Sequence, residues 1–319
     1  MPLLSVKGLR THFHTEHGVV KAVDGVSFDL EPGEILGLVG ESGSGKSVTN
    51  LSILRLVEHP GVNAGGEILF EGQDILKMDR STIRALRGHR IAMIFQDPMT
   101  SLNPTLRVGR QITEVLELHL KLRPKAARKR AIELLEKVGI PGPAERIDQY
   151  PHELSGGMRQ RVVIAMALAC EPTLLLADEP TTALDVTIQA QILELIQKLA
   201  KETGTAVVLV THDLGVVAGV ADKVAVMYGG RIVEKAPVVE LYQNPQHPYT
   251  RGLLASVPRL DTRGALVPIP GMPPNLASMG PGCAFAPRCP LADEKCATYP
   301  EWQGSPTHGA ACWRPGSPS

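Results

Sequence analysis

The chain has 319 residues, of which 43% are hydrophobic and 21% are charged, and its 33 basic and 33 acidic residues give a formal net charge of zero. This length and composition predict a globular protein of about two domains. The balanced charge gives no global reason to expect nucleic acid or an anionic membrane surface as the main partner. No segment approaches the roughly 20 apolar residues of a membrane span, so at a membrane another chain would have to cross it.

The N-terminal stretch MPLLSVKGLRTHF lacks the apolar run and the small-residue cleavage site of a secretory signal. The predicted compartment is therefore the cytoplasm. Because the cytoplasm is reducing, we do not expect disulfides.

Short apolar runs alternate with helical patterns, as in an α/β protein. The predicted strands are residues 26–30, 34–40, 66–72, 91–96, 173–178, 205–212 and 223–234. Helical periodicity is clearest at 107–122, 126–140 and 186–203. The first two of these helices adjoin one another between two predicted strands, which indicates an inserted helical lobe at about 97–165.

The stretch GESGSGKS, from Gly40 to Ser47, fits the pattern G-x-x-x-x-G-K-[ST] between a predicted strand and a predicted helix. Glycines in such a loop let backbone amides converge on phosphate oxygens, and the helix N-terminus adds a positive dipole end. We expect Lys46 to reach the β- and γ-phosphates and the Ser47 hydroxyl to bind Mg²⁺.

A basic stretch, RPKAARKR at 123–130, precedes an amphipathic helical pattern. It has no interleaved aromatic residues, so a solvated helix face is favoured over a nucleic-acid site.

Ser155, Gly156 and Gly157 lie just before the helical stretch MRQRVVIAMALA. A hydroxyl and closely approaching backbone amides at a helix N-terminus predict a second anion site.

The apolar strand TLLLAD ends in Asp178, and Glu179 follows. A carboxylate at this strand end, beside the phosphate loop, suits Mg²⁺ binding through water, and the next carboxylate can polarise an attacking water.

After about Ala236 the chain becomes rich in proline, and we expect an appended module at 237–319. Four of the five cysteines lie here in the spacing C-x5-C-x6-C-x15-C: Cys283, Cys289, Cys296 and Cys312. In a reducing compartment they are expected to be metal ligands, but the spacing matches neither zinc knuckles nor ferredoxin patterns. Widely spaced thiolates can wrap a cluster larger than one ion, and Arg288 and Lys295 could offset its negative charge.

The order of these motifs resembles that in the ATP-binding subunits of ABC transporters. After the phosphate loop come FQDP with Gln96, LSGGMRQR, Asp178–Glu179, TTALD ending in Asp185, and VTHD with His212. They resemble the family's Q-loop, signature sequence, Walker B motif, D-loop and H-loop. The resemblance covers residues 1 to about 235 and implies a P-loop NTPase core with an ABC-type helical subdomain, here over 1–236, followed by a small irregular cysteine-rich module.

The resemblance also implies roles. Two subunits would pair head-to-tail, with each ATP between the phosphate loop of one and the signature sequence of the other. Glu179 would be the catalytic base, His212 would contact the γ-phosphate, and Asp185 would relay information across the dimer. The residues implied for the nucleotide are Gly40, Ser42, Gly43, Ser44, Gly45, Lys46, Ser47, Val48, Gln96, Ser155, Gly156, Gly157, Asp178 and His212; those for Mg²⁺ are Ser47, Gln96 and Asp178. Phe13 and His17 are the nearest candidates for the aromatic residue that stacks on adenine in this family.

Two longer stretches, 95–112 and 244–258, resemble importers of dipeptides, oligopeptides and nickel. They imply an ATPase subunit that energises solute import, with di- or oligopeptides favoured over nickel. Its partners would be a second, different ATPase subunit, two transmembrane permeases and, indirectly, an extracytoplasmic solute-binding protein, at the cytoplasmic face of the membrane. Soluble relatives in DNA repair or translation are the alternative, although the chain carries one ATPase copy and no sustained heptads.

In this group of importers a similar four-cysteine tail is associated, in some members, with a [4Fe–4S] cluster. The resemblance therefore favours such a cluster at Cys283, Cys289, Cys296 and Cys312, with zinc or free thiols as the alternatives.

Overall fold

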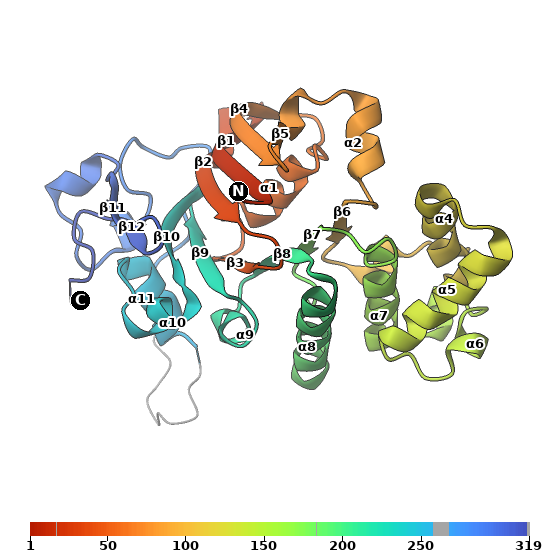
Figure 1. Cartoon of the computed structure of the whole chain (residues 1–319). Helices are drawn as coiled ribbons and strands as arrows, with labels where there is room; N and C mark the ends of the chain where they lie inside the picture. Colours follow the sequence, from red (N-terminus) through yellow and green to blue (C-terminus); the bar gives the residue numbers. More distant parts are fainter. Residues whose placement is uncertain (17, 183, 258–267, 318–319) are drawn as a thin grey trace. The chain divides into compact units, whose positions relative to one another are not determined.

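The computed structural model describes residues 1–16, 18–182, 184–257 and 268–317 (Figure 1). The chain divides into two compact units. The first unit comprises Met1–Glu31, Ile35–Lys77 and Val210–Ser319, and the second comprises Pro32–Glu34 and Met78–Leu209. Among the described residues, no helix has both the length and the apolar character to cross a bilayer.

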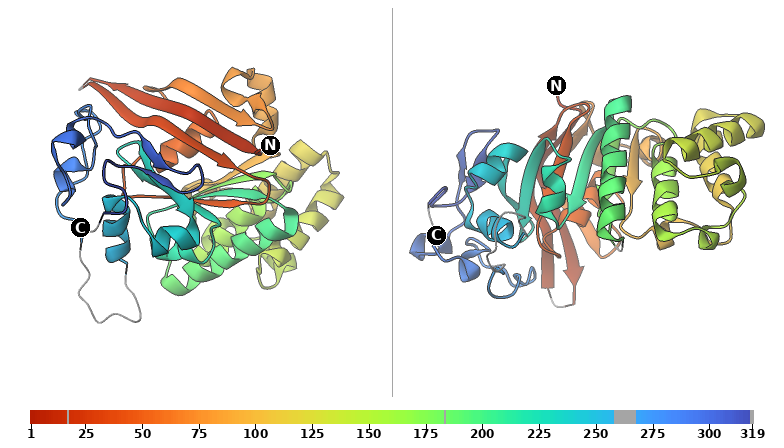
Figure 2. Two further views of the ribbon diagram at one scale, coloured as in Figure 1. Left: turned by 60° about the vertical axis from the view of Figure 1, so that its left-hand side comes forward. Right: turned by 90° about the horizontal axis from the view of Figure 1, so that it is seen from below.

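The first unit contains an antiparallel sheet with the strand order β2-β1-β4-β5. Its strands are β1 (Leu4–Thr15), β2 (Gly18–Leu30), β4 (Gly61–Phe70) and β5 (Gln73–Asp74), and the long β1–β2 pair is visible in red in Figure 2. Strand β1 was not predicted from the sequence. The pairing of β1 with β2 and β4 is shifted by bulges, which interrupt the alternation of buried and exposed residues on which strand prediction rests.

The second sheet of this unit runs from β3 (Ile35–Val39) through β9 (Lys223–Tyr228) and β10 (Arg231–Pro237) to β12 (Gly309–Ala311) and β11 (Trp302–Gly304). The pairing of β3 with β9 is parallel, and that of β9 with β10 is antiparallel. The prediction of one strand over 223–234 is therefore wrong. Gly229 and Gly230 have φ angles of 56° and 77°, in the left-handed region that glycine adopts readily, and they turn the chain into a hairpin.

The helical segments of the first unit are short. They are α1 (Lys46–Ile53), η1 (Ile75–Lys77), α9 (Leu214–Ala218), α10 (Val238–Gln243), α11 (Pro248–Ala255), η3 (Ala286–Arg288) and η4 (Glu294–Ala297). The proline-rich tail also adds β12 and β11 to the edge of β10, as the dark blue strands of Figure 1 show. Ala310 and Ala311 of β12 are buried there, so the tail shares the core of this unit.

The second unit holds β6 (Ile91–Ile94), β7 (Leu174–Asp178) and the start of β8 (Ala206–Thr211), with β6 and β7 parallel. The segment between β6 and β7 is helical, with α3 (Pro98–Ser101), α4 (Val108–Leu120), α5 (Pro124–Lys137), α6 (Pro143–Arg146), η2 (Pro151–Glu153) and α7 (Gly156–Ala167). Helices α2 (Arg80–Leu86) and α8 (Val186–Thr203) complete the unit. The helices predicted at 107–122, 126–140 and 186–203 are confirmed as α4, α5 and α8.

Candidate nucleotide-binding and hydrolysis site

The phosphate loop connects β3 to α1 within the first unit. Its glycines Gly40, Gly43 and Gly45 all have positive φ, at 155°, 78° and 102°. A Cβ atom on Gly40 would collide with the carbonyl oxygen of Met227, and one on Gly45 with that of Ala22. The loop conformation therefore requires glycine at these positions, and the N-cap residue of α1, Gly45, has no side chain with which to cap the helix.

Lys46 lies at the first residue of α1 and is only 4% exposed. Its Nζ donates to the carbonyl oxygens of Gly40 (2.8 Å) and Glu41 (2.9 Å), and it lies 3.4 Å from the hydroxyl of Ser44. The loop thus encircles a buried ammonium group, while Ser42 and Gly43 are exposed and Ser47 and Val48 are half-buried. This arrangement of charge and backbone suits a bound polyphosphate.

In the second unit, the buried strand β7 ends at Asp178, which is 5% exposed, and Glu179 follows. Glu179 has a φ of 45°, an uncommon conformation for a residue with a Cβ. Its Oε2 accepts from Gln96 Nε2 at 3.0 Å and from the hydroxyl of Thr182 at 2.8 Å. Gln96 and Glu179, 83 residues apart, are brought together. Thr182 was missed by sequence reasoning, because only the fold shows which hydroxyl reaches the carboxylate.

The signature residues form the N-terminus of α7. Ser155 is the N-cap of this helix, and its hydroxyl accepts a long hydrogen bond of 3.4 Å from the backbone N–H of Met158. A Cβ atom on Gly157 would lie 3.1 Å from Cγ2 of Ile188 in α8, whereas one on Gly156 would meet only Leu184, at 3.7 Å. Ser155 and Gly156 are exposed, so this helix end presents its amides to solvent.

Two further motif residues lie at the ends of elements. The Asp185 side chain caps α8 by accepting from the backbone N–H of Ile188 at 2.9 Å. His212 follows β8 in the first unit and is exposed, beside Asp213, whose carboxylate caps α9.

One of the two adenine-stacking candidates, Phe13, lies on β1 and is half-buried. A Cβ atom on Gly61 of β4 would lie 2.6 Å from its Cε1, so its ring packs over that glycine. The other candidate, His17, lies outside the described residues.

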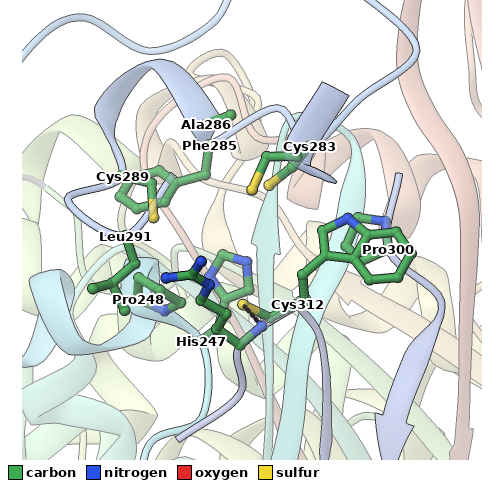
Figure 3. A pocket seen from close by; sticks show the side chains of 12 residues that line it. His247, Pro248, Cys283, Phe285, Ala286, Cys289, Leu291, Pro300 and Cys312 are labelled. Atoms are coloured by element: carbon green, nitrogen blue, oxygen red, sulfur yellow. Dashed lines mark hydrogen bonds between the residues drawn. The ribbon is translucent and has the colours of Figure 1, made fainter. Parts of the chain in front are cut away.

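The four tail cysteines line one hollow of the first unit. Figure 3 shows the sulfur atoms of Cys283, Cys289 and Cys312 turned towards the same space, and Cys296 lines it too. All four thiols are free. Burial raises the pKa of the Cys283 thiol to about 11 and also raises those of Cys289 and Cys312. Among the described residues, no three His, Cys, Asp or Glu side chains are grouped so as to hold a single metal ion.

Arg288, which the sequence suggested could offset the charge of a cluster, directly precedes Cys289. Its guanidinium is paired with Glu41 of the phosphate loop. Lys295 lies in η4, next to Cys296.

Two family models match the chain. Residues 23–182 match the family described as ABC transporter, and residues 233–296 match the family described as oligopeptide/dipeptide transporter, C-terminal region. Among the similar proteins is the dipeptide transport ATP-binding protein DppD of Bacillus subtilis (strain 168), 55% identical over 315 residues that cover 98% of this chain and 94% of the relative. The oligopeptide transport ATP-binding protein OppD of the same organism is 59% identical over 293 residues, covering 91% and 82%.

A similar solved structure is the dimeric, post-hydrolysis state of the ATP-binding cassette MJ0796 bound to ADP and Pi. The two chains are 28% identical with a TM-score of 0.66, and the match covers 74% of this chain and 98% of that one.

The α/β cassette and its motifs define an ATPase, and the chain belongs to the ABC transporter family. Within that family it is the ATP-binding subunit of an oligopeptide/dipeptide transporter, and it hydrolyses ATP to drive transport.

Proposed function

We propose that this subunit powers the import of di- or oligopeptides through two separate permease chains, at the cytoplasmic face of the membrane. The observation that carries the proposal is the presence of an ABC cassette and the oligopeptide/dipeptide C-terminal region on one chain. The C-terminal match favours peptide import over the DNA-repair and translation alternatives. No feature of the described residues favours nickel over peptides as the solute.

Binding of ATP would use the phosphate loop and the signature sequence. Lys46 and the loop amides would hold the β- and γ-phosphates of one nucleotide, and Ser155 and the α7 N-terminus of a partner subunit would hold the same γ-phosphate from the other side. The dimeric state named for the MJ0796 cassette supports such a pairing. Each subunit would then close on ATP and separate once the γ-phosphate is cleaved.

Hydrolysis would use Glu179 as general base. A water attacks the γ-phosphorus as the bond to the β-phosphate oxygen breaks, and Glu179 takes the proton of that water. Gln96 and Thr182 support this role because both donate to Oε2 and so fix the orientation of the carboxylate. His212 would contact the γ-phosphate.

Ser47, Gln96 and Asp178 would hold Mg²⁺, and their hydroxyl, amide and carboxylate oxygens fit the preference of this ion for oxygen ligands. When bound, Mg²⁺ would neutralise charge on the β- and γ-phosphates.

The peptide assignment is tested by expressing the subunit with its native membrane partners and purifying the complex. We expect two permeases and a second ATPase chain to co-purify, and labelled dipeptide uptake into vesicles to require ATP and Lys46. Co-purification of nucleic acid or ribosomes without membrane subunits would overturn the assignment. Uptake of Ni²⁺ but not of peptides would show that the imported solute is nickel and not peptides.

We also propose that Cys283, Cys289, Cys296 and Cys312 hold a [4Fe–4S] cluster as a structural staple. The four thiols share one hollow, which fits four thiolate ligands around a cluster. A single Zn²⁺ is the alternative, since four thiolates also suit that ion. A cluster would supply folding energy to a segment with few apolar residues of its own.

Anaerobic purification followed by iron and sulfide analysis tests the cluster. We expect about four iron and four sulfide per chain, and Cys289→Ser should lose them and lower the melting temperature. A colourless wild-type protein that carries one zinc per chain would rule the cluster out.

A further inference from the structure

The C-terminal region contacts the phosphate loop directly through one partly buried ion pair. Arg288 Nη1 donates to Oε2 of Glu41 at 2.7 Å, and its Nη2 donates to Oε1 at 3.0 Å. The Arg288 side chain is 5% exposed and that of Glu41 is 26% exposed. Glu41 is the second residue of the loop GESGSGKS, and Lys46 Nζ binds its carbonyl oxygen. A two-point guanidinium–carboxylate pair is the strongest geometry available to these groups.

The Arg288 guanidinium is also held in place by hydrogen bonds to groups other than Glu41. Its Nε donates to the carbonyl oxygen of Pro270 at 2.9 Å, and Nη2 lies 3.3 Å from the carbonyl oxygen of Ile269. Nη1 also donates to the hydroxyl of Tyr228 at 3.1 Å. Each of the three guanidinium nitrogens therefore has a fixed acceptor, so little side-chain freedom remains to be lost when the pair forms.

A second contact from the same region reaches the backbone of Glu41. Its N–H donates to the hydroxyl of Tyr249 in α11 at 2.8 Å, and Tyr249 is fully buried. The ring of Tyr249 packs on Tyr228 with centroids 4.4 Å apart. Both the main chain and the side chain of Glu41 are thus held by residues of the C-terminal region.

We propose that Arg288 is a positioning residue for ATP binding, which acts through Glu41. It neutralises the one carboxylate of the phosphate loop and fixes the start of that loop. An uncompensated carboxylate within a Debye length, about 8 Å at physiological ionic strength, repels a triphosphate. The affinity of the cassette for ATP therefore depends on the C-terminal region.

Substitutions of the two partners should have opposite effects on the KM for ATP. Arg288→Ala leaves Glu41 charged beside the phosphates, so we expect the KM for ATP to rise about three- to tenfold with kcat within about twofold. Glu41→Gln removes the repelling charge and keeps an acceptor, so its KM should be equal to or below that of the wild type. The double variant should return to within about twofold of the wild-type KM. Salt should shrink the Arg288→Ala effect.

The test uses the full-length chain in its transporter complex, with ATPase kinetics and binding of a fluorescent ATP analogue. Arg128→Ala is the matched control, since it removes another two-point arginine–carboxylate pair, with Asp148, in the second unit. The proposal is overturned if Arg288→Ala leaves the KM unchanged, or if Glu41→Gln raises the KM as much as Arg288→Ala, which is the result for a bracing role alone. If Arg288→Ala fails to fold, the Glu41→Gln result decides.

Discussion

Glu179 combines an unusual backbone conformation with two side-chain donors. Its φ of 45° is uncommon for a non-glycine residue, and such conformations persist where the surrounding structure holds them. The hydrogen bonds from Gln96 and Thr182 hold the carboxylate at the end of β7. A base that is fixed before the substrate arrives loses less freedom in the transition state.

Substitution of Thr182 should separate its effect on the orientation of the Glu179 carboxylate from any effect on ATP binding. Thr182→Val deletes one donor to Glu179 while conserving side-chain volume. We expect kcat to fall about ten- to hundredfold with the KM for ATP unchanged, the cost of one hydrogen bond to a charged group. Steady-state ATPase kinetics measure both constants. A rise in KM at unchanged kcat would mean that Thr182 acts on nucleotide binding.

Lys46 should be needed for binding itself. Its ammonium group is buried among the loop carbonyls, at the place where the loop would receive phosphates. Lys46→Ala should weaken ATP binding by more than tenfold, because it removes a charge-assisted contact from a buried site. Equilibrium binding of a fluorescent ATP analogue measures the loss, and wild-type affinity would contradict the assignment.

At the scale of residues, the motifs could be predicted because each is local in sequence. The glycines of the phosphate loop, Ser155 at the start of α7 and Asp178 at the end of β7 lie at the expected element ends. Thr182, Tyr249 and the Glu41–Arg288 pair could not be predicted. The pair joins residues 247 positions apart, and nothing in either local sequence indicates the other.

At the scale of elements, the N-terminus of α7 is distinct from that of α1. Both helices begin in glycine-rich turns, and the turn before α1 leaves no room for a side chain at Gly40 or Gly45. In α7, Gly157 packs against Ile188 of α8, but Gly156 is exposed to solvent. A side chain can therefore be added at Gly156 without disturbing the unit to which α7 belongs.

Gly156→Asp places a negative charge at this helix end with little steric cost. We expect ATP binding to a single chain to remain near the wild-type level, because the phosphate loop is unchanged. ATP-driven dimerisation and hydrolysis should fall more than tenfold, because the carboxylate would repel the γ-phosphate held by the partner chain. Binding measurements and size-exclusion chromatography with ATP test both parts. Full hydrolysis by this variant would exclude α7 from the composite site.

The two sheets of the first unit are linked by an ion pair between strands. Asp24 of β2 accepts from Arg231 of β10 at 2.6 and 3.2 Å. Burial acts to raise the pKa of Asp24, but the hydrogen bonds and charge of Arg231 outweigh burial and hold the pKa below its ordinary value. The unfolded chain then binds more protons, so this stabilisation is present above the ordinary carboxyl pKa and is lost as the pH falls through the folded value.

Asp24→Asn should therefore destabilise the protein at neutral pH by about 1–3 kcal/mol. The difference in melting temperature from the wild type should stay constant from pH 7 down to the ordinary carboxyl pKa, and shrink as the pH falls further through the lower folded value. Calorimetry at several pH values measures this trend. A difference that stays constant over the whole of this range would show that packing, and not the charge of Asp24, links the sheets.

Elements with unbroken periodicity could be predicted from the sequence, such as α4, α5, α8 and the buried strands β7 and β8. Strand β1 was missed because bulges break its alternation, and the β9–β10 hairpin was read as one strand because the Gly229–Gly230 turn interrupts it only briefly. The tail lacks periodicity because its strands β11 and β12 are short and complete the edge of a sheet formed by residues far earlier in the chain.

At the scale of the whole molecule, the chain contains a cassette that hydrolyses ATP and a C-terminal region. Residues of that region contact the phosphate loop. The family matches cover these two parts separately. Through the contacts of Arg288 and Tyr249 with Glu41, a change in the conformation of the tail would change the conformation of the phosphate loop. Transport and nucleotide binding should therefore respond together when the tail is altered.

The most direct test of the central claim is ATP hydrolysis by the reconstituted transporter that carries Glu179→Gln in this subunit. We expect this variant to bind ATP with near wild-type affinity, to accumulate the closed ATP-bound dimer and to lose turnover at its own site by at least a hundredfold. Hydrolysis at the wild-type rate at that site would contradict this expectation, because a carboxylate that the reaction does not need cannot be the base.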